Sequence, residues 1–208
     1  MIAKYVKTKI LMTMTLTNSV IDPVCRDIIR AAKEGDAQLL QSLLLHTLSA
    51  KVMINALCYA ISHGHLACCR LLLDKGADIN GVGLSGSTPL LTAVGTQNIE
   101  IADQLLQRGA DVNASDEAGR TPLLVAILNL SGLDLIRLLL DAGANTNQID
   151  NRGLAPLWAT ILENRNPDIM RLLMQYGADT TVSYFGKLLI DVARKNGLND
   201  FEQILTQL

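Results

Sequence analysis

Apolar and polar residues follow each other along most of the chain with the spacing of short amphipathic helices. Ile101, Leu105 and Leu106 share one face of a helix, and Leu135, Leu138 and Leu139 repeat the spacing further on. A shorter apolar stretch precedes each of these segments. Aromatic residues make up only 3% of the chain, which suits tightly stacked helices better than a β-sandwich or barrel. The pattern predicts an all-α protein built from pairs of short helices.

The pattern has a fixed period. Gly-Ala pairs recur at steps of 33, 34 and 34 residues, and a second series of glycines runs in phase with them. Self-similarity at such a period indicates a repeat architecture. The pairs begin at Gly76, Gly109, Gly143 and Gly177, and the second series is Gly86, Gly119, Gly153 and Gly186.

The ends of the helices can be placed from local chemistry. Thr88-Pro89 and Thr121-Pro122 each combine a hydroxyl that can cap a helix with a proline that suits its first turn. Pro156 keeps the proline, and the last start, at Lys187, keeps neither. The glycine of each Gly-Ala pair lies where the second helix ends and a left-handed residue is favoured. Each repeat therefore holds two short helices and a turn.

These motifs carry a resemblance to a known family. Gly-x-Thr-Pro-Leu followed by Leu-Leu-x-x-Gly-Ala-Asp-x-Asn resembles the ankyrin repeat, over residues 50–208 and most strongly over 83–182. The resemblance implies an all-α solenoid of stacked antiparallel helix pairs with β-turn or hairpin loops between repeats. We expect a flexible or weakly docked leader at 1–21, an N-terminal capping helix pair at 22–49, repeats at 50–82, 83–115, 116–149 and 150–182, and a C-terminal capping repeat at 183–208.

The two ends depart from the repeat. Gly35 and Gly64 are only 29 residues apart, so the first unit is expected to lack the extended loop. The last unit ends in a segment with one polar side, as the end of a stack requires. Ankyrin repeats commonly carry histidine after Thr-Pro-Leu, and this chain has none there. Trp158 occupies one of these positions and is large enough to bury on the order of 200 Å² between helices, so we assign it to the core.

Charge and hydropathy exclude several partners. With 18 basic and 20 acidic side chains the chain has a formal net charge of −2, which gives no basic field for nucleic acid. No stretch approaches the roughly 20 apolar residues of a membrane span. Residues 1–21 imitate a secretory signal poorly, because their apolar part is short and broken by threonines. We expect a cytoplasmic protein that is monomeric on its own, with export of a microbial effector left open.

Three of the four cysteines and two of the three histidines lie in one repeat. Cys58, His63, His65, Cys68 and Cys69 superficially offer zinc ligands. The register places Cys68 and Cys69 at apolar positions of a second helix, where neighbouring residues point about 100° apart. The uneven spacing of the cysteines in a chain of this size argues against a disulfide framework. Apolar packing around the thiols argues against a reactive cysteine. We therefore expect buried free cysteines and no metal or cofactor.

No enzyme signature is present. The chain has no phosphate-binding glycine loop, no paired carboxylates and no Gly-x-Ser-x-Gly turn. Asp116 and Asp150 precede the loop glycines by three residues, and the resemblance implies that such aspartates bind backbone amides in the turn.

The resemblance also implies a binding surface formed by the loop tips and the exposed ends of the first helices. The candidate partner-binding residues are Leu84, Ser87, Thr96, Glu117, Arg120, Leu128, Asn129, Arg152, Leu154, Leu162, Tyr184 and Phe185. Arg120, Arg152, Tyr184 and Phe185 rank first, since these residue types most often dominate binding energy. Two alternatives stay open: Phe185 covers the last hydrophobic seam, or the arginines are ordinary solvated charges.

The sequence thus predicts a non-catalytic protein-protein interaction module, an adaptor or inhibitor that binds a protein partner on its concave face. The alternative is a microbial effector delivered to a host cell, or a toxin-neutralising protein, using the same face. An enzyme would need catalytic groups grafted onto that face, and the sequence offers no nucleophile paired with a base.

Overall fold

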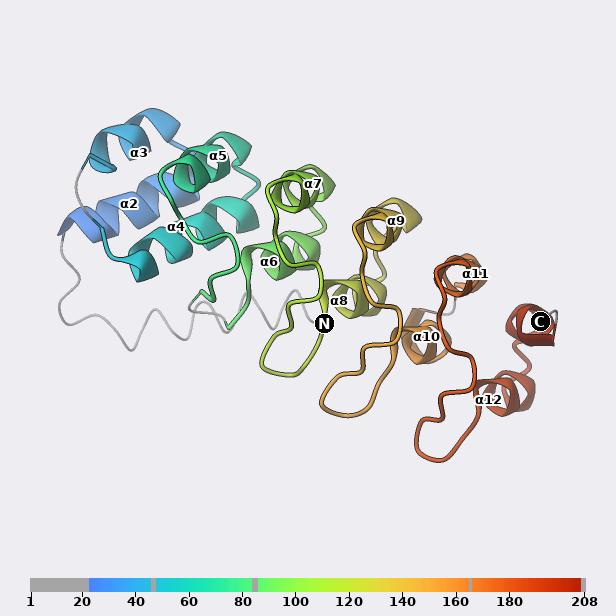
Figure 1. The fold of residues 1–208 in the computed structure, drawn as a ribbon. Helices are drawn as coiled ribbons and strands as arrows, with labels where there is room; N and C mark the ends of the chain where they lie inside the picture. Colours follow the sequence, from blue (N-terminus) through green and yellow to red (C-terminus); the bar gives the residue numbers. More distant parts are fainter. Residues whose placement is uncertain (1–22, 46–47, 84–85, 165, 207–208) are drawn as a thin grey trace. The chain divides into compact units, whose positions relative to one another are not determined.

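The computed structural model describes residues 23–45, 48–83, 86–164 and 166–206. The chain divides into two compact units, Met1–Asp116 and Glu117–Leu208. In the described ranges the secondary structure is helical, with a single isolated antiparallel bridge between Tyr184 and Lys187 and no strand (Figure 1). The predicted all-α class is confirmed.

The first unit contains three helix pairs, in which first helices pack on first helices. α2 packs against α4 and α4 against α6, while the second helices α3 and α5 pack on each other. Arg70 Nε donates to Gln104 Oε1 at 2.9 Å, and Arg108 pairs with Asp74 at 2.6 Å, so α5 and α7 are also joined. The helices are α2 (Pro23–Glu34), α3 (Ala37–Leu43), α4 (Ala50–Ser62), α5 (Leu66–Asp74), α6 (Pro89–Gly95) and α7 (Ile99–Gln107).

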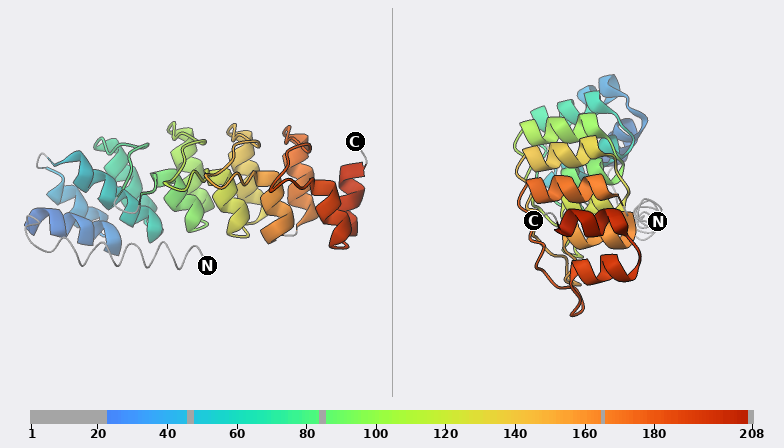
Figure 2. Two further views of the ribbon diagram at one scale, coloured as in Figure 1. Left: turned by 90° about the horizontal axis from the view of Figure 1, so that it is seen from below. Right: turned by 90° about the vertical axis from the view of Figure 1, so that its right-hand side faces the viewer.

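The second unit repeats the arrangement. α8 packs against α10 and the π-helix η1, α9 against α11, and α11 against α13. The loops between α9 and α10 and between α11 and α12 protrude on the same side of this unit (Figures 1 and 2). The helices are α8 (Pro122–Leu128), α9 (Leu133–Asp141), α10 (Pro156–Ala159), η1 (Thr160–Asn164), α11 (Pro167–Gln175), α12 (Leu189–Lys195) and α13 (Asn199–Thr206).

The helix boundaries follow from the predicted local chemistry. The Oγ1 of Thr88 accepts the N–H of Leu91 at 3.3 Å, and that of Thr121 accepts the N–H of Leu124 at the same distance. The four glycines that end the second helices have φ between +83° and +89°, the left-handed region in which glycine carries no steric penalty. Both predictions about the helix ends are confirmed.

The Asp-x-Asn motif links one loop to the next. Asp78 and Asp111 each accept, through Oδ1, the backbone N–H two residues further on, at 2.9 Å. Asn80 Oδ1 in turn accepts the N–H of Asp111 at 2.8 Å. In the second unit Asn147 Oδ1 accepts the N–H of Asp179 at 2.8 Å in the same way. The motif therefore stabilises both the turn and the stacking of successive loops.

The core of the second unit centres on Trp158. This side chain is 1% exposed, and its Nε1–H donates to the carbonyl of Val182 at 2.8 Å. An unpaired indole N–H would be costly to bury, so this bond allows the ring to fill the core. The prediction that Trp158 is a core residue is confirmed.

Candidate functional site

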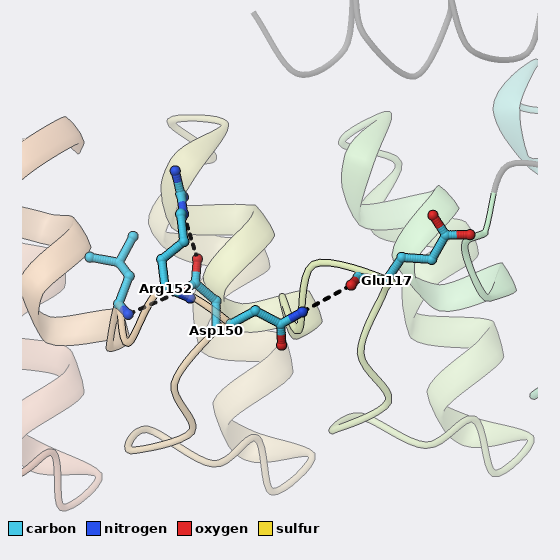
Figure 3. Close-up of polar contacts among 5 residues, drawn as sticks. Glu117, Asp150 and Arg152 are labelled. Carbon is cyan, nitrogen blue, oxygen red and sulfur yellow. Dashed lines mark hydrogen bonds and ion pairs between the residues drawn. The ribbon is translucent and has the colours of Figure 1, made fainter.

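The loop between α9 and α10 is organised by a buried carboxylate. Asp150 Oδ1 accepts the N–H of Arg152 at 2.8 Å and of Leu154 at 2.9 Å, and Oδ2 accepts from Arg152 Nε at 3.3 Å (Figure 3). The Asp150 side chain is 1% exposed, whereas that of Arg152 is 68% exposed. The predicted structural role of Asp150 is confirmed. Its hydrogen bonds fix the backbone of the loop from which the Arg152 side chain extends.

The backbone of this loop is a three-residue hairpin. Asp150 N donates to the carbonyl of Leu154 at 3.1 Å, and Gly153 N donates to the carbonyl of Asp150 at 2.9 Å. Gly153 has a φ of +80°, as the third residue of such a loop requires.

The preceding loop is bound directly to this one. Asn151 Nδ2 donates to the carbonyl of Glu117 at 3.0 Å (Figure 3). Asn151 N also donates to the carbonyl of Ala118, at 3.0 Å. A Cβ at Gly119 would lie 2.5 Å from Asn151 Oδ1, so the two loops meet too closely for any other residue there. The two loop tips are consequently held in one arrangement.

The loop between α11 and α12 has a different geometry. Tyr184 and Lys187 exchange both backbone hydrogen bonds at 3.1 Å, and the two residues between them, Phe185 and Gly186, have φ of +49° and +70°. Positive φ at both central residues defines a two-residue hairpin of the I′ kind. The Tyr184 ring lies 5.6 Å from that of Trp158 and 4.4 Å from that of Phe185, measured between centroids. The loop is thus supported from beneath by the tryptophan.

The candidate binding residues differ in exposure. Thr96, Glu117, Arg152, Leu162 and Phe185 are exposed, and Ser87, Arg120, Leu128, Asn129 and Tyr184 are half-buried. Leu84 lies outside the described residues. Phe185 is 81% exposed, so it does not cover the last hydrophobic seam, the alternative that the sequence left open.

The expected exposure of Leu154 is wrong. Its side chain is only 4% exposed, and its N–H is bound by Asp150. Ser87 and Arg120, at the equivalent positions of the preceding loops, are half-buried. Leu154 directly precedes Ala155, the N-cap of α10, and its apolar side chain is buried where the polar Ser87 and Arg120 stay half-buried.

The cysteine and histidine cluster has structural roles. Cys68 and Cys69 are buried as predicted, and burial raises the pKa of Cys69 to about 12 and that of Cys58 to about 11. His65 Nε2–H donates to the carbonyl of Lys33 at 3.0 Å, which ties α5 to the end of α2. Within the described ranges, no three His, Cys, Asp or Glu residues are placed to hold a metal ion.

Two features escaped the sequence reasoning, and both leave a trace in the spacing. Leu130 is 62% exposed with a φ of +57°, at the position that Gly64 and Gly197 fill in other repeats. The hairpin at Phe185 arises because Gly177 and Gly186 are nine residues apart, whereas the corresponding glycines of the earlier loops are ten apart. The loop is one residue shorter, which converts the three-residue hairpin into a two-residue one.

Stacked helix pairs with capped starts, left-handed ends and interlocked loops define a helical repeat protein. The family model for ankyrin repeats (3 copies) matches residues 28–116 and 108–184, so the chain belongs to the ankyrin-repeat family. Members of this family generally act as protein-protein interaction modules and are typically non-catalytic. No curated protein matches the sequence. Among the helices that the structure describes, none has the length and apolar character needed to cross a membrane.

Proposed function

We propose that this chain is a non-catalytic adaptor or inhibitor that binds a protein partner through the loop tips and first-helix ends of its second unit. The observation that carries the proposal is the pair of hydrogen bonds from Asn151 to the carbonyls of Glu117 and Ala118. These bonds fix two neighbouring loop tips in one arrangement before any partner arrives. A surface that is already ordered loses less conformational entropy on association.

The proposed surface combines charge, aromatic rings and aliphatic side chains. Loop tips contribute Glu117, Arg120, Arg152, Tyr184 and Phe185, and the ends of α8 and η1 contribute Leu128, Asn129 and Leu162. Leu154 takes no part in it, because its side chain is buried. Ser87 and Thr96 occupy the equivalent positions in the first unit and are proposed contacts there, as is Leu84.

The chemistry of the described side chains supports binding over catalysis. A thiolate is the nucleophilic form of cysteine, and the raised pKa values of Cys58 and Cys69 keep those thiols protonated at neutral pH. The carboxylate of Asp150 is already occupied by two backbone N–H groups and a guanidinium. The alternative of an effector or toxin-neutralising protein depends on residues 1–21, which lie outside the described residues.

The test is affinity capture from the source cell's lysate with three versions of the full-length chain. These are the wild type, Arg120→Glu with Arg152→Glu, and a control in which Arg137→Glu and Arg171→Glu place the same charge change on α9 and α11. Circular dichroism first establishes that all three are equally helical. We expect a partner that the wild type and the control capture and the loop variant does not. Equal capture by all three would reject this surface.

A further inference from the structure

The tip of the last hairpin carries a residue that its backbone disfavours. Phe185 has a φ of +49°, and a bulky side chain in this region is uncommon and strained. Two-residue hairpins of this kind favour Asn, Asp or Gly at that position. Ala118 and Arg152, which precede the glycine in the two earlier loops of the unit, have ordinary negative φ. The strain therefore belongs to this loop.

Packing does not explain the phenylalanine. Its side chain is 81% exposed, and its ring contact is an edge-on one with Tyr184. The hairpin is already fixed without it, by the Tyr184–Lys187 backbone bonds and by the bond from Trp158 to the carbonyl of Val182. Beyond the contact with Tyr184, the side chain gains little burial in return for its strained backbone, and residues that break a local rule in this way are expected at functional or strained positions.

Apart from the buried Asp150, the charged residues of the two hairpins, 150–154 and 183–188, are cations. Arg152 is exposed, and its Nε is the atom that contacts Asp150, whose own carboxylate is buried. Lys187 is exposed at the base of the hairpin. Residues 150–154 and 183–188 contain no other acidic residue than Asp150. The tips of these two loops, residues 150–154 and 183–188, thus present an aromatic ring together with two cations, while the exposed Asp179 lies nearer to α11 in the second loop.

We propose that Phe185 is the anchor of the binding surface and that its occupant is an acidic protein segment with a large apolar side chain beside Asp or Glu. The apolar side chain would pack on the rings of Phe185 and Tyr184, and the carboxylates would pair with Arg152 and Lys187. Aromatic and arginine anchors are the residues that most often dominate binding energy. This inference rests on the proposed function and adds the chemistry of the partner to it.

The test uses the full-length chain and a displayed library of random 12-residue peptides. We expect the selected peptides to be acidic and to contain an aromatic or long aliphatic residue. One selected peptide, labelled with fluorescein, is then titrated by fluorescence polarisation. Phe185→Asn should raise its Kd at least tenfold, while Phe185→Leu should raise it less because an apolar surface remains. A version of the peptide with every Asp and Glu replaced by the amide should also bind at least tenfold more weakly.

Leu130→Asn is the matched control, since it also removes an exposed apolar side chain at a positive φ in the same unit. It should leave the Kd unchanged. Phe185→Asn should unfold at the same or a higher temperature than the wild type, which separates the loss of binding from misfolding. Selection of basic peptides, or of peptides that bind Phe185→Asn as well as the wild type, would overturn the inference. If the lysate capture described above still depends on Arg120 and Arg152 in that case, the proposed function stands without this anchor.

Discussion

Replacement of Asp150 by alanine is expected to destabilise the second unit far more than replacement by asparagine. Both backbone N–H groups that the carboxylate binds, those of Arg152 and Leu154, donate to the same atom, Oδ1. Alanine removes this acceptor and leaves the buried N–H of Leu154 unpaired, which costs about 1 to 3 kcal/mol. The N–H of Arg152 is nearer to solvent and adds about 1 kcal/mol. These two terms sum to about 2 to 4 kcal/mol, and relief of carboxylate burial brings the net loss somewhat below that sum.

Asparagine keeps an oxygen in the Oδ1 position, so both backbone bonds can persist with a neutral acceptor. The loss for Asp150→Asn is therefore expected to be about 1 kcal/mol. Arg152→Gln removes an ion pair whose cation is 68% exposed, and such pairs contribute about 0 to 1 kcal/mol. The expected order of destabilisation is Asp150→Ala, then Asp150→Asn, then Arg152→Gln.

The free energies of unfolding are measured by urea titration. Trp158 is the single tryptophan, and it lies in the core of the same unit, so its fluorescence reports the transition of that unit. Circular dichroism, followed in parallel, reports the whole chain. If Asp150→Asn or Arg152→Gln proves as destabilising as Asp150→Ala, the ion pair and not the shared oxygen stabilises the loop.

Three further predictions concern other contacts. Gly119→Ala should destabilise the protein by about 3 kcal/mol and Gly153→Ala by about 1 kcal/mol. Both glycines have positive φ, but only at Gly119 would a Cβ collide with a neighbouring loop, at 2.5 Å from Asn151 Oδ1. Equal losses in urea titrations would contradict this. The thiols of Cys58 and Cys69 stay protonated in the folded chain up to a pKa of about 11 and about 12, but ionise near 9.0 when unfolded. The free energy of unfolding should therefore be constant below pH 9 and fall above it, by about 1.4 kcal/mol per pH unit for each thiol, until the folded pKa is reached. Thermal melts at several pH values should show this fall in the wild type and a flatter one when both cysteines are alanine. Trp158→Ala should lower the free energy of unfolding by about 3 to 5 kcal/mol. A loss below about 1 kcal/mol, measured from the urea midpoint, would contradict the assignment of Trp158 to the core.

Much of the fold could be predicted because the determinants are local. The hydroxyl of Thr88, the ring of Pro89 and the glycine nine or ten residues before each loop glycine act on their own turn. Their positions in the sequence are therefore enough to place the helix ends. Trp158 could be assigned to the core for a similar reason, since the repeat register fixes the face on which it lies. Such features need no knowledge of distant contacts.

The candidate site was less predictable because it depends on how loops meet. The burial of Leu154 could not be predicted from its equivalents, because Ser87 and Arg120 are polar and only half-buried at the corresponding positions. The contact of Gly119 with Asn151 joins residues that are far apart in the sequence. The strain at Phe185 depends on a hairpin type that is selected by loop length and not by residue pattern.

The shortened last loop has a consequence for how such a surface can change during evolution. The loss of one residue between Gly177 and Gly186 requires no new side chain, yet it moves the residue before the glycine from an ordinary turn position to the apex of a hairpin. The deletion or insertion of one loop residue can therefore change the exposure of an aromatic ring that is already present. Among stacked repeats that share one register, a difference in loop length can change the binding surface before any contact residue has been substituted.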